Sequence, residues 1–184
     1  HLQRYLMTNN RYSKAFNLSF ENVIGAEGGY TQDPEDTGNW TGGRKGVGKL
    51  NGTRYGVSAA SYPFVDIKSL TIEDAKTIYY NDFWTPIKGD SVPFAIANAL
   101  FDCAINSGCT TSVKLLQRAL GLKEDGVIGN ATITEAINNK EALTLYLTAR
   151  AVFYSRLAKF ELYGKGWMKR LFIVHQQSLL GNPA

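Results

Sequence analysis

The 184-residue chain has the composition of a globular protein, with 44% hydrophobic and 20% charged residues, and no stretch is long and apolar enough to cross a membrane. Twenty Lys and Arg against sixteen Asp and Glu give a net charge of +4. This mild basic excess suits an anionic polymer, such as nucleic acid or bacterial cell wall. No Lys/Arg-rich run of the kind that marks a nucleic-acid patch is present, so the charge alone does not choose between these two polymers. The motifs described below favour the cell wall, and we expect no nucleic-acid partner.

The first predicted helix runs from about residue 13 to residue 27. Phe16, Phe20, Val23 and Ile24 follow the i, i+4, i+7, i+8 spacing of a stripe that faces a core. Glu27 continues this stripe one turn later, so a carboxylate stands where an apolar side chain is due.

Gly28-Gly29 is expected to end this helix, because glycine adopts the left-handed conformation of a helix C-terminus at little cost. Glu27 would then lie in the last turn, where partial burial and the negative end of the helix dipole both raise the pKa of a carboxyl. A raised pKa suits a general acid that donates a proton near neutral pH. The alternative is an edge glutamate whose carboxylate lies in water.

Residues 31–56 are dense in Gly, Thr, Asn, Asp and Pro, which predicts loops or short hairpins. The pattern then becomes helical. Thr71 with Asp74 resembles a capping box, Ser112 an N-cap, and Gly164 is expected to end a long helix. The further helices are expected over residues 71–82, 93–107, 112–121, 131–138, 140–163 and 167–180.

Asn98, Asp102 and Asn106 recur every fourth residue on the helix expected over 93–107. They either meet solvent or line a polar cleft, and the otherwise apolar character of the helix favours the cleft. Cys103 and Cys109 are expected to be free thiols rather than a disulfide. The two histidines are isolated and the cysteines have no histidine neighbours in the sequence, so we expect no metal and no cofactor.

Several sequence blocks, in order along the chain, resemble glycoside hydrolase family 108: EGGYTQDPEDTGN, GTRYGVS, EDAKTIYYNDFW, ALFDCAINSG, LLQRALGLKEDGVIGNATI and a final GW. Members of that family are N-acetylmuramidases, lysozyme-like enzymes of phage lysis and bacterial secretion, with a C-terminal peptidoglycan-binding region. The resemblance implies a mainly α, lysozyme-like α+β fold: a helical bundle with a small loop or β-hairpin lobe after the first helix. It also implies a catalytic region over 8–109 and a helical peptidoglycan-binding region over 110–184, packed as one unit.

The resemblance identifies Glu27 of the EGGY block with the family's catalytic glutamate. By a further likeness to phage-type lysozymes, Asp36 would be the second carboxylate and a threonine would help to hold the attacking water. An insertion, GGRKGVGKLNG, separates the candidates Thr41 and Thr53, and Thr53 fits better because Tyr55-Gly56-Val57 follows it. Asp36 has an alternative role as an ordinary turn residue.

Candidate sugar-binding side chains are aromatic rings and polar groups that could equally be core or turn residues. They are Tyr30, Trp40, Thr41, Tyr55, Asp102 and Asn106.

Together these features predict a monomeric muramidase that cleaves peptidoglycan glycan strands. It would be made without a classical signal peptide and act in the periplasm or cell wall after export or lysis. The open alternatives are a lytic transglycosylase and a non-catalytic peptidoglycan-binding protein. Inversion and retention are both compatible with the sequence, since the separation of the two carboxyl groups decides between them.

Overall fold

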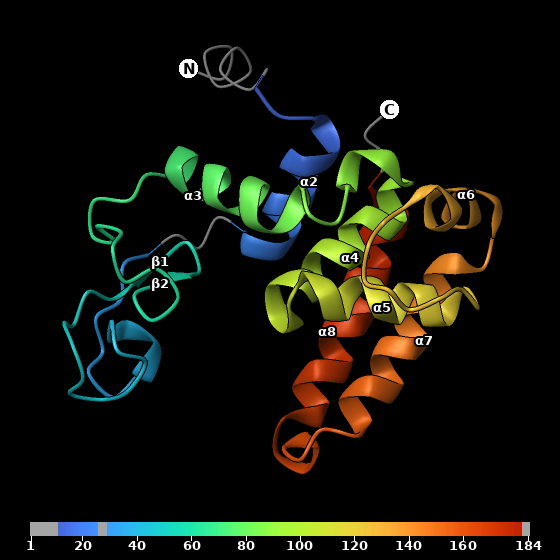
Figure 1. Ribbon diagram of the computed structural model, residues 1–184. Coiled ribbons are helices and arrows are strands. Elements are labelled where there is room, and N and C mark those ends of the chain that lie inside the picture. Colours follow the sequence, from blue (N-terminus) through green and yellow to red (C-terminus); the bar gives the residue numbers. More distant parts are fainter. Residues whose placement is uncertain (1–10, 26–28, 182–184) are drawn as a thin grey trace. The chain divides into compact units, whose positions relative to one another are not determined.

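The computed structural model describes residues 11–25 and 29–181. Its contacts divide these residues into two compact units, Phe20–Tyr80 and the remainder. Over the described residues the chain is mainly α, with seven α-helices and one two-stranded sheet, which confirms the predicted fold class (Figure 1). None of the described helices is long and apolar enough to cross a membrane.

The smaller unit, Phe20–Tyr80, we call the hairpin lobe. It contains the end of α2 (Lys14–Ile24), the 3-10 turn η1 (Thr37–Asn39), strands β1 (Thr53–Arg54) and β2 (Val57–Ser58), and α3 (Ile72–Tyr79). The strands pair antiparallel, with Thr53 opposite Ser58 and Arg54 opposite Val57.

The β1–β2 connection is the two-residue turn Tyr55-Gly56. Its φ angles are 51° and 73°, and positive φ at both central residues is the requirement of a type I′ hairpin turn. Tyr55 bears some strain in this conformation because it has a Cβ. The Tyr79 hydroxyl holds the turn by donating a 2.9 Å hydrogen bond to the Tyr55 carbonyl oxygen.

A small apolar core supports the hairpin lobe. Phe20, Val57 and Ile67 are each 1% exposed, and the rings of Phe20 and Tyr79 meet edge to face at 5.7 Å. Burial of the phenol raises the pKa of Tyr79 to about 12. α3 begins with the predicted capping box, in which the Thr71 and Asp74 side chains each accept the other's backbone N–H.

The first helix is shorter than expected. α2 begins after Ser13, whose Oγ accepts a 3.0 Å bond from the Phe16 N–H, and it ends at Ile24. Gly25 follows with φ 69°, so it takes the left-handed conformation that was expected of Gly28-Gly29. The expectation that the helix carries Glu27 in its last turn is therefore wrong, because an earlier glycine ends it. The Glu27 side chain itself lies outside the described residues.

The second unit, which we call the helical unit, is built around α4 (Phe94–Ser107). α4 contacts α5 (Cys109–Ala119), α7 (Ala142–Ser155) and α8 (Phe160–Leu180), while α6 (Asn130–Asn138) follows α5 in the chain. Ala97, Ala99 and Ala104 on α4 are fully buried, and such small side chains let neighbouring helices approach closely.

Aromatic rings fill the part of the helical unit next to α4. The ring of Trp84, at the end of the π-helix η2 (Tyr80–Trp84), lies 5.5 Å from the rings of both Phe16 and Phe101, with edge-to-face geometry. A short 3-10 turn, η3 (Gly89–Ser91), then leads to α4. Pro93 precedes α4 and Gly108, with φ 88°, ends it, in agreement with the helix expected over residues 93–107.

Two predicted helix boundaries in the helical unit are wrong. Ser112 lies inside α5 instead of capping it, and its buried hydroxyl bonds the Leu100 carbonyl oxygen at 2.8 Å. The long helix breaks between α7 and α8 at residues 156–159, and not at Gly164. Gly164 is buried inside α8, where a Cβ would lie 2.6 Å from the Phe160 ring, so this glycine serves close packing.

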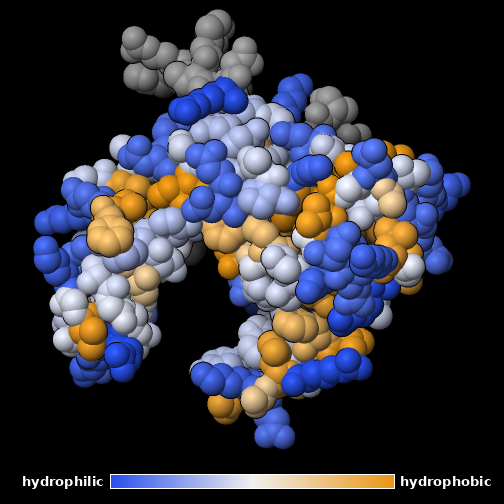
Figure 2. All heavy atoms as spheres, viewed as in Figure 1, coloured by the Kyte–Doolittle hydropathy of each residue, from blue (hydrophilic) through white to orange (hydrophobic). Residues whose placement is uncertain are grey.

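The α7–α8 end of the helical unit exposes both apolar and charged side chains. Leu157, Leu162 and Tyr163 are 37%, 78% and 53% exposed. Figure 2 shows hydrophobic residues among hydrophilic ones at this end. Cys103 and Cys109, also in this unit, are free thiols, as expected.

Candidate functional site

Asp36, the predicted second carboxylate, lies on the surface of the hairpin lobe. It is the N-cap of η1, where its Oδ1 accepts a 2.9 Å hydrogen bond from the Gly38 N–H. Among the described residues, Oδ2 has no hydrogen-bond partner and remains open to a ligand. Asp36 therefore fulfils the turn role that the sequence allowed and still has one carboxylate oxygen available for chemistry.

Asn39, at the other end of η1, organises the lobe and was not singled out from the sequence. It is fully buried, and its Oδ1 accepts a 2.7 Å bond from the Thr53 hydroxyl while its Nδ2 donates to the Asp33 carbonyl oxygen at 3.0 Å. Its own carbonyl oxygen accepts the backbone N–H groups of Asn51 and Gly52, both at 3.0 Å. In the sequence Asn39 is one more residue of a polar loop, and no local pattern marks it as buried.

Thr53 and Thr41 have different environments. Thr53 pairs with Thr31 through two 2.9 Å backbone bonds, and its hydroxyl proton is used in the bond to Asn39, so its oxygen can meet a ligand only as an acceptor. The Thr41 oxygen accepts a 2.8 Å bond from the Lys49 N–H and so ties together the two arms of the inserted loop. Thr41 therefore stabilises the inserted loop.

The three candidate aromatic side chains of the lobe are half-buried, and two of them have their polar atoms bonded to backbone. The Tyr30 hydroxyl donates to the Asn51 carbonyl oxygen at 3.0 Å, and the Trp40 indole N–H donates to the Pro34 carbonyl oxygen at 2.9 Å. The Arg54 guanidinium lies 5.3 Å from the centre of the Tyr55 ring. These bonds fix the rings in place, which suits contact surfaces.

The substrate-binding role expected of Asp102 is corrected by the structure. Asp102 is fully buried, and its carboxylate bonds two arginines: Arg150 Nη2 lies 2.6 Å from Oδ2, and Arg170 Nε lies 2.7 Å from Oδ1. Asn98, on the same stripe, is also fully buried and donates to the Ser178 hydroxyl at 3.1 Å. Asn98 and Asp102 therefore belong to a polar network in the core and line no cleft, because Arg150 on α7 and Arg170 on α8 neutralise the Asp102 carboxylate.

Asn106, the last residue of that stripe, is exposed at the end of α4. Its place is in the helical unit, whereas the other remaining candidates belong to the hairpin lobe. Its predicted role in substrate binding stays a prediction.

A groove of about 530 Å³ crosses the hairpin lobe. It is lined by Tyr30 and Gln32, by residues 49–51 and by residues 63–68. Its lining mixes aromatic, amide, ammonium and carboxylate groups. Such a mixture is typical of a site that recognises a polar ligand with some apolar surface.

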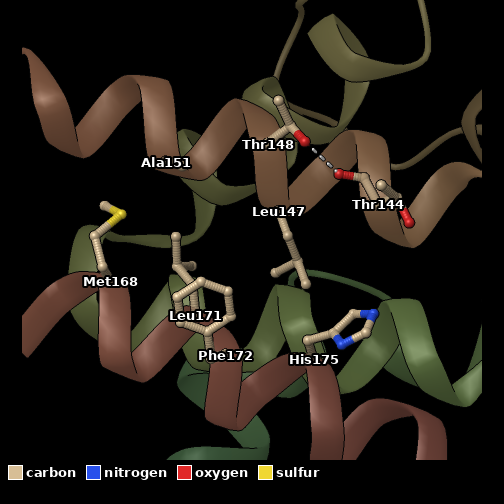
Figure 3. Close-up of a pocket in the computed structure, with 8 residues that line it drawn as sticks. All are labelled: Thr144, Leu147, Thr148, Ala151, Met168, Leu171, Phe172 and His175. Carbon is tan, nitrogen blue, oxygen red and sulfur yellow. Dashed lines mark hydrogen bonds between the residues drawn. The ribbon is translucent and has the colours of Figure 1, made fainter.

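A second groove, of about 290 Å³, lies in the helical unit between α7 and α8 (Figure 3). Its walls are mostly apolar, with the side chains of Leu147, Met168 and Phe172 between the two helices. His175 is the one titratable side chain among the residues that line it. With no second titratable partner there, this groove offers no pair of groups for acid–base chemistry. Among the described residues, no group of three or more His, Cys, Asp or Glu side chains is placed to hold a metal ion.

Comparison with known proteins gives two family matches along the chain. Residues 20–108 match the family described as glycosyl hydrolase 108, and residues 111–172 match a predicted peptidoglycan domain. The structure titled SagA of Brucella abortus is similar to this chain, with a TM-score of 0.71 and 29% identity, over 89% of this chain and 93% of that one. No curated protein sequence matches the chain.

The two families account for the two kinds of structure seen in the chain. The glycosyl hydrolase match contains the hairpin lobe and extends through α4, and the peptidoglycan match extends from α5 into α8. A glycosidase joined to a peptidoglycan domain supports hydrolysis of peptidoglycan. Residues 20–108 are therefore similar to the glycosyl hydrolase 108 family, and the residues that follow are similar to a predicted peptidoglycan domain.

Proposed function

We propose that this peptidoglycan hydrolase is an N-acetylmuramidase that cleaves the β-1,4 bond between N-acetylmuramic acid and N-acetylglucosamine. The observation that carries the proposal is the family match over residues 20–108, which includes the EGGY block with Glu27. The site would act on the cell wall after export or lysis, in phage lysis or in bacterial secretion.

Glu27 is the proposed general acid. It gives its proton to the bridging oxygen as the bond from that oxygen to the anomeric carbon breaks, and the sugar passes through an oxocarbenium-like state. The acid must stay protonated until the substrate is bound. Since α2 ends at Ile24, the helix dipole is not the proposed cause of a raised pKa.

Asp36 is the proposed base, with Thr53 as its helper. A water molecule that donates one hydrogen to Asp36 Oδ2 and the other to Thr53 Oγ1 would turn a lone pair toward the anomeric carbon. Both oxygens are suited to accept, because Oδ2 has no partner among the described residues and the Thr53 proton already bonds Asn39. Asp36 takes a proton from the water as the new bond forms, and the product is inverted.

A lytic transglycosylase is the second candidate. That reaction also needs one acid but no positioned water, because the sugar's own hydroxyl closes an anhydro ring. The open oxygen of Asp36 favours hydrolysis, since a transglycosylase has no use for a water-holding carboxylate. A purely binding protein is less compatible with the glycosyl hydrolase match.

The test is digestion of purified peptidoglycan followed by mass spectrometry of the fragments. We expect reducing N-acetylmuramic acid ends. Anhydro ends would identify a transglycosylase, and reducing N-acetylglucosamine ends would identify a glucosaminidase. Asp36→Asn should lower kcat without loss of binding to sacculi, and an unchanged kcat would remove Asp36 from the proposed mechanism.

A further inference from the structure

The groove of the hairpin lobe contains an aromatic side chain that the lobe leaves in solvent. Phe64 is 100% exposed, whereas nearby Ile67 and Leu70 are 1% and 5% exposed. Phenylalanine is usually buried, so a fully exposed ring on an ordered surface marks a candidate contact site.

The exposed position of Phe64 is built into the lobe. Pro63 and Phe64 occupy the centre of a turn closed by a 3.2 Å bond from the Val65 N–H to the Tyr62 carbonyl oxygen. Arg54 Nη1, on β1, donates a 2.8 Å bond to the Lys68 carbonyl oxygen and ties this loop to the hairpin. With its backbone held at both ends, the loop presents the Phe64 ring at little further entropic cost on binding.

The lining residues that come from residues 30–51 are also fixed. The Tyr30 hydroxyl bonds the Asn51 carbonyl oxygen at 3.0 Å, and Gln32 Nε2 bonds the Leu50 carbonyl oxygen at 2.5 Å. Residues 30 and 32 are two positions apart in an extended segment, so their side chains point to the same side of that segment. Thr41, through its bond to the Lys49 N–H, holds the start of residues 49–51.

Charge identifies the ligand class. Lys49 and Lys68 both line the groove, and among the described residues neither ammonium forms an ion pair. Asp66 is the one acidic residue of the lining, so the groove carries a net charge of +1. Unpaired ammonium groups select carboxylates, which peptidoglycan carries on its peptide stems, whereas its sugar rings offer hydroxyl and acetamido groups.

We propose that this groove is a subsite for the peptide stem of peptidoglycan, with Lys49 and Lys68 bound to stem carboxylates and Phe64 packed on the alkyl groups of the stem. Asp66 then meets stem amide or ammonium groups. This subsite rests on the proposed function, because it supposes that a peptidoglycan strand is the substrate, and it adds a preference for strands that still carry stems.

The test compares two substrates: soluble glycan strands with intact stems, and the same strands after an amidase has removed the stems. For Phe64→Ala and for Lys49→Gln/Lys68→Gln we expect KM on stem-bearing strands to rise about tenfold with kcat unchanged, the pattern of lost uniform binding. On stripped strands both variants should match the wild-type protein. Lys45→Gln, an exposed lysine paired with Glu35 in the same lobe, and Leu179→Ala, an exposed apolar side chain in the helical unit, are the controls.

An equal rise in KM on both substrates would mean that the groove binds sugar. An unchanged KM on both substrates would mean that the groove is not a subsite. Either result overturns the proposal. If the wild-type protein cleaves neither substrate, the proposed function fails, and the subsite is judged by binding alone. In that case a purified stem tetrapeptide is titrated into the protein and followed by NMR. Binding that Lys49→Gln/Lys68→Gln abolishes supports the subsite, and absence of binding refutes it.

Discussion

The buried Asp102 carboxylate yields the prediction that separates a structural role from a binding role most clearly. Asp102→Asn keeps the size of the side chain but removes its charge. Arg150, whose side chain is also fully buried, then loses the negative charge 2.6 Å away that neutralises it, while its bonds to the Ala99 carbonyl oxygen and the Tyr154 hydroxyl remain. Breaking a buried ion pair in this way costs about 3–5 kcal/mol, because an uncompensated charge remains in the core.

For a chain of this length each kcal/mol lowers Tm by roughly 2–4 °C, so Asp102→Asn should lower Tm by about 6–20 °C. Differential scanning calorimetry measures the shift. Glu124→Gln is the matched control, since it breaks a bidentate bond to Arg118 on the surface, and we expect no measurable change in Tm. Activity of Asp102→Asn, assayed below its Tm, should equal that of the wild-type protein. A normal Tm with a strongly raised KM would refute the structural role and return Asp102 to the substrate site.

Two further predictions concern the hairpin lobe. Asn39→Ala removes two part-buried hydrogen bonds: the Thr53 hydroxyl loses its acceptor, while the Asp33 carbonyl oxygen keeps the bond from the Asp36 N–H. We therefore expect a loss of about 1–3 kcal/mol in urea unfolding and a lower kcat, whereas Asn138→Ala on the exposed end of α6 should change neither. Unaltered stability of Asn39→Ala would contradict the proposed organising role. Tyr79 has a folded pKa of about 12 against an ordinary 10, so between pH 10 and 12 the unfolded chain loses a proton that the folded chain keeps, and stability falls. The loss approaches roughly 2.7 kcal/mol, from 1.36 kcal/mol per pKa unit, and Tyr79→Phe should show a smaller decline over this range; identical declines in the two proteins would count against it.

Features with a local cause could be predicted from the sequence. The capping box of Thr71 and Asp74, and the start and end of α4 at Pro93 and Gly108, each depend on residues within one helical turn. The same holds for the turn-rich stretch over residues 31–56, whose glycines and polar residues exclude a regular helix. Such features can be predicted because residues close in the sequence make all the contacts involved.

Other features depend on partners that are distant in the sequence. Asp102 is neutralised by Arg150 and Arg170, which lie 48 and 68 positions away, so the sequence pattern alone could not distinguish a buried network from a polar cleft. Asn39 is buried because the loop folds around it, and its partner Thr53 is 14 positions away. No periodicity in the sequence reports either arrangement.

Choices between equivalent local signals also failed. Gly25 and the pair Gly28-Gly29 were all able to end α2, and the chain uses Gly25. The break between α7 and α8 falls at residues 156–159, which contain no glycine or proline. Gly164, the expected breaker, is instead buried in α8 beneath the Phe160 ring.

The central claim is that Glu27 supplies the proton that breaks the glycosidic bond. Its most direct test is the rate of release of reducing sugar from purified peptidoglycan by Glu27→Gln, with circular dichroism and binding to sacculi as checks on folding. We predict that Glu27→Gln folds, binds sacculi and releases no reducing sugar above background. Substantial release by the folded variant would contradict the claim.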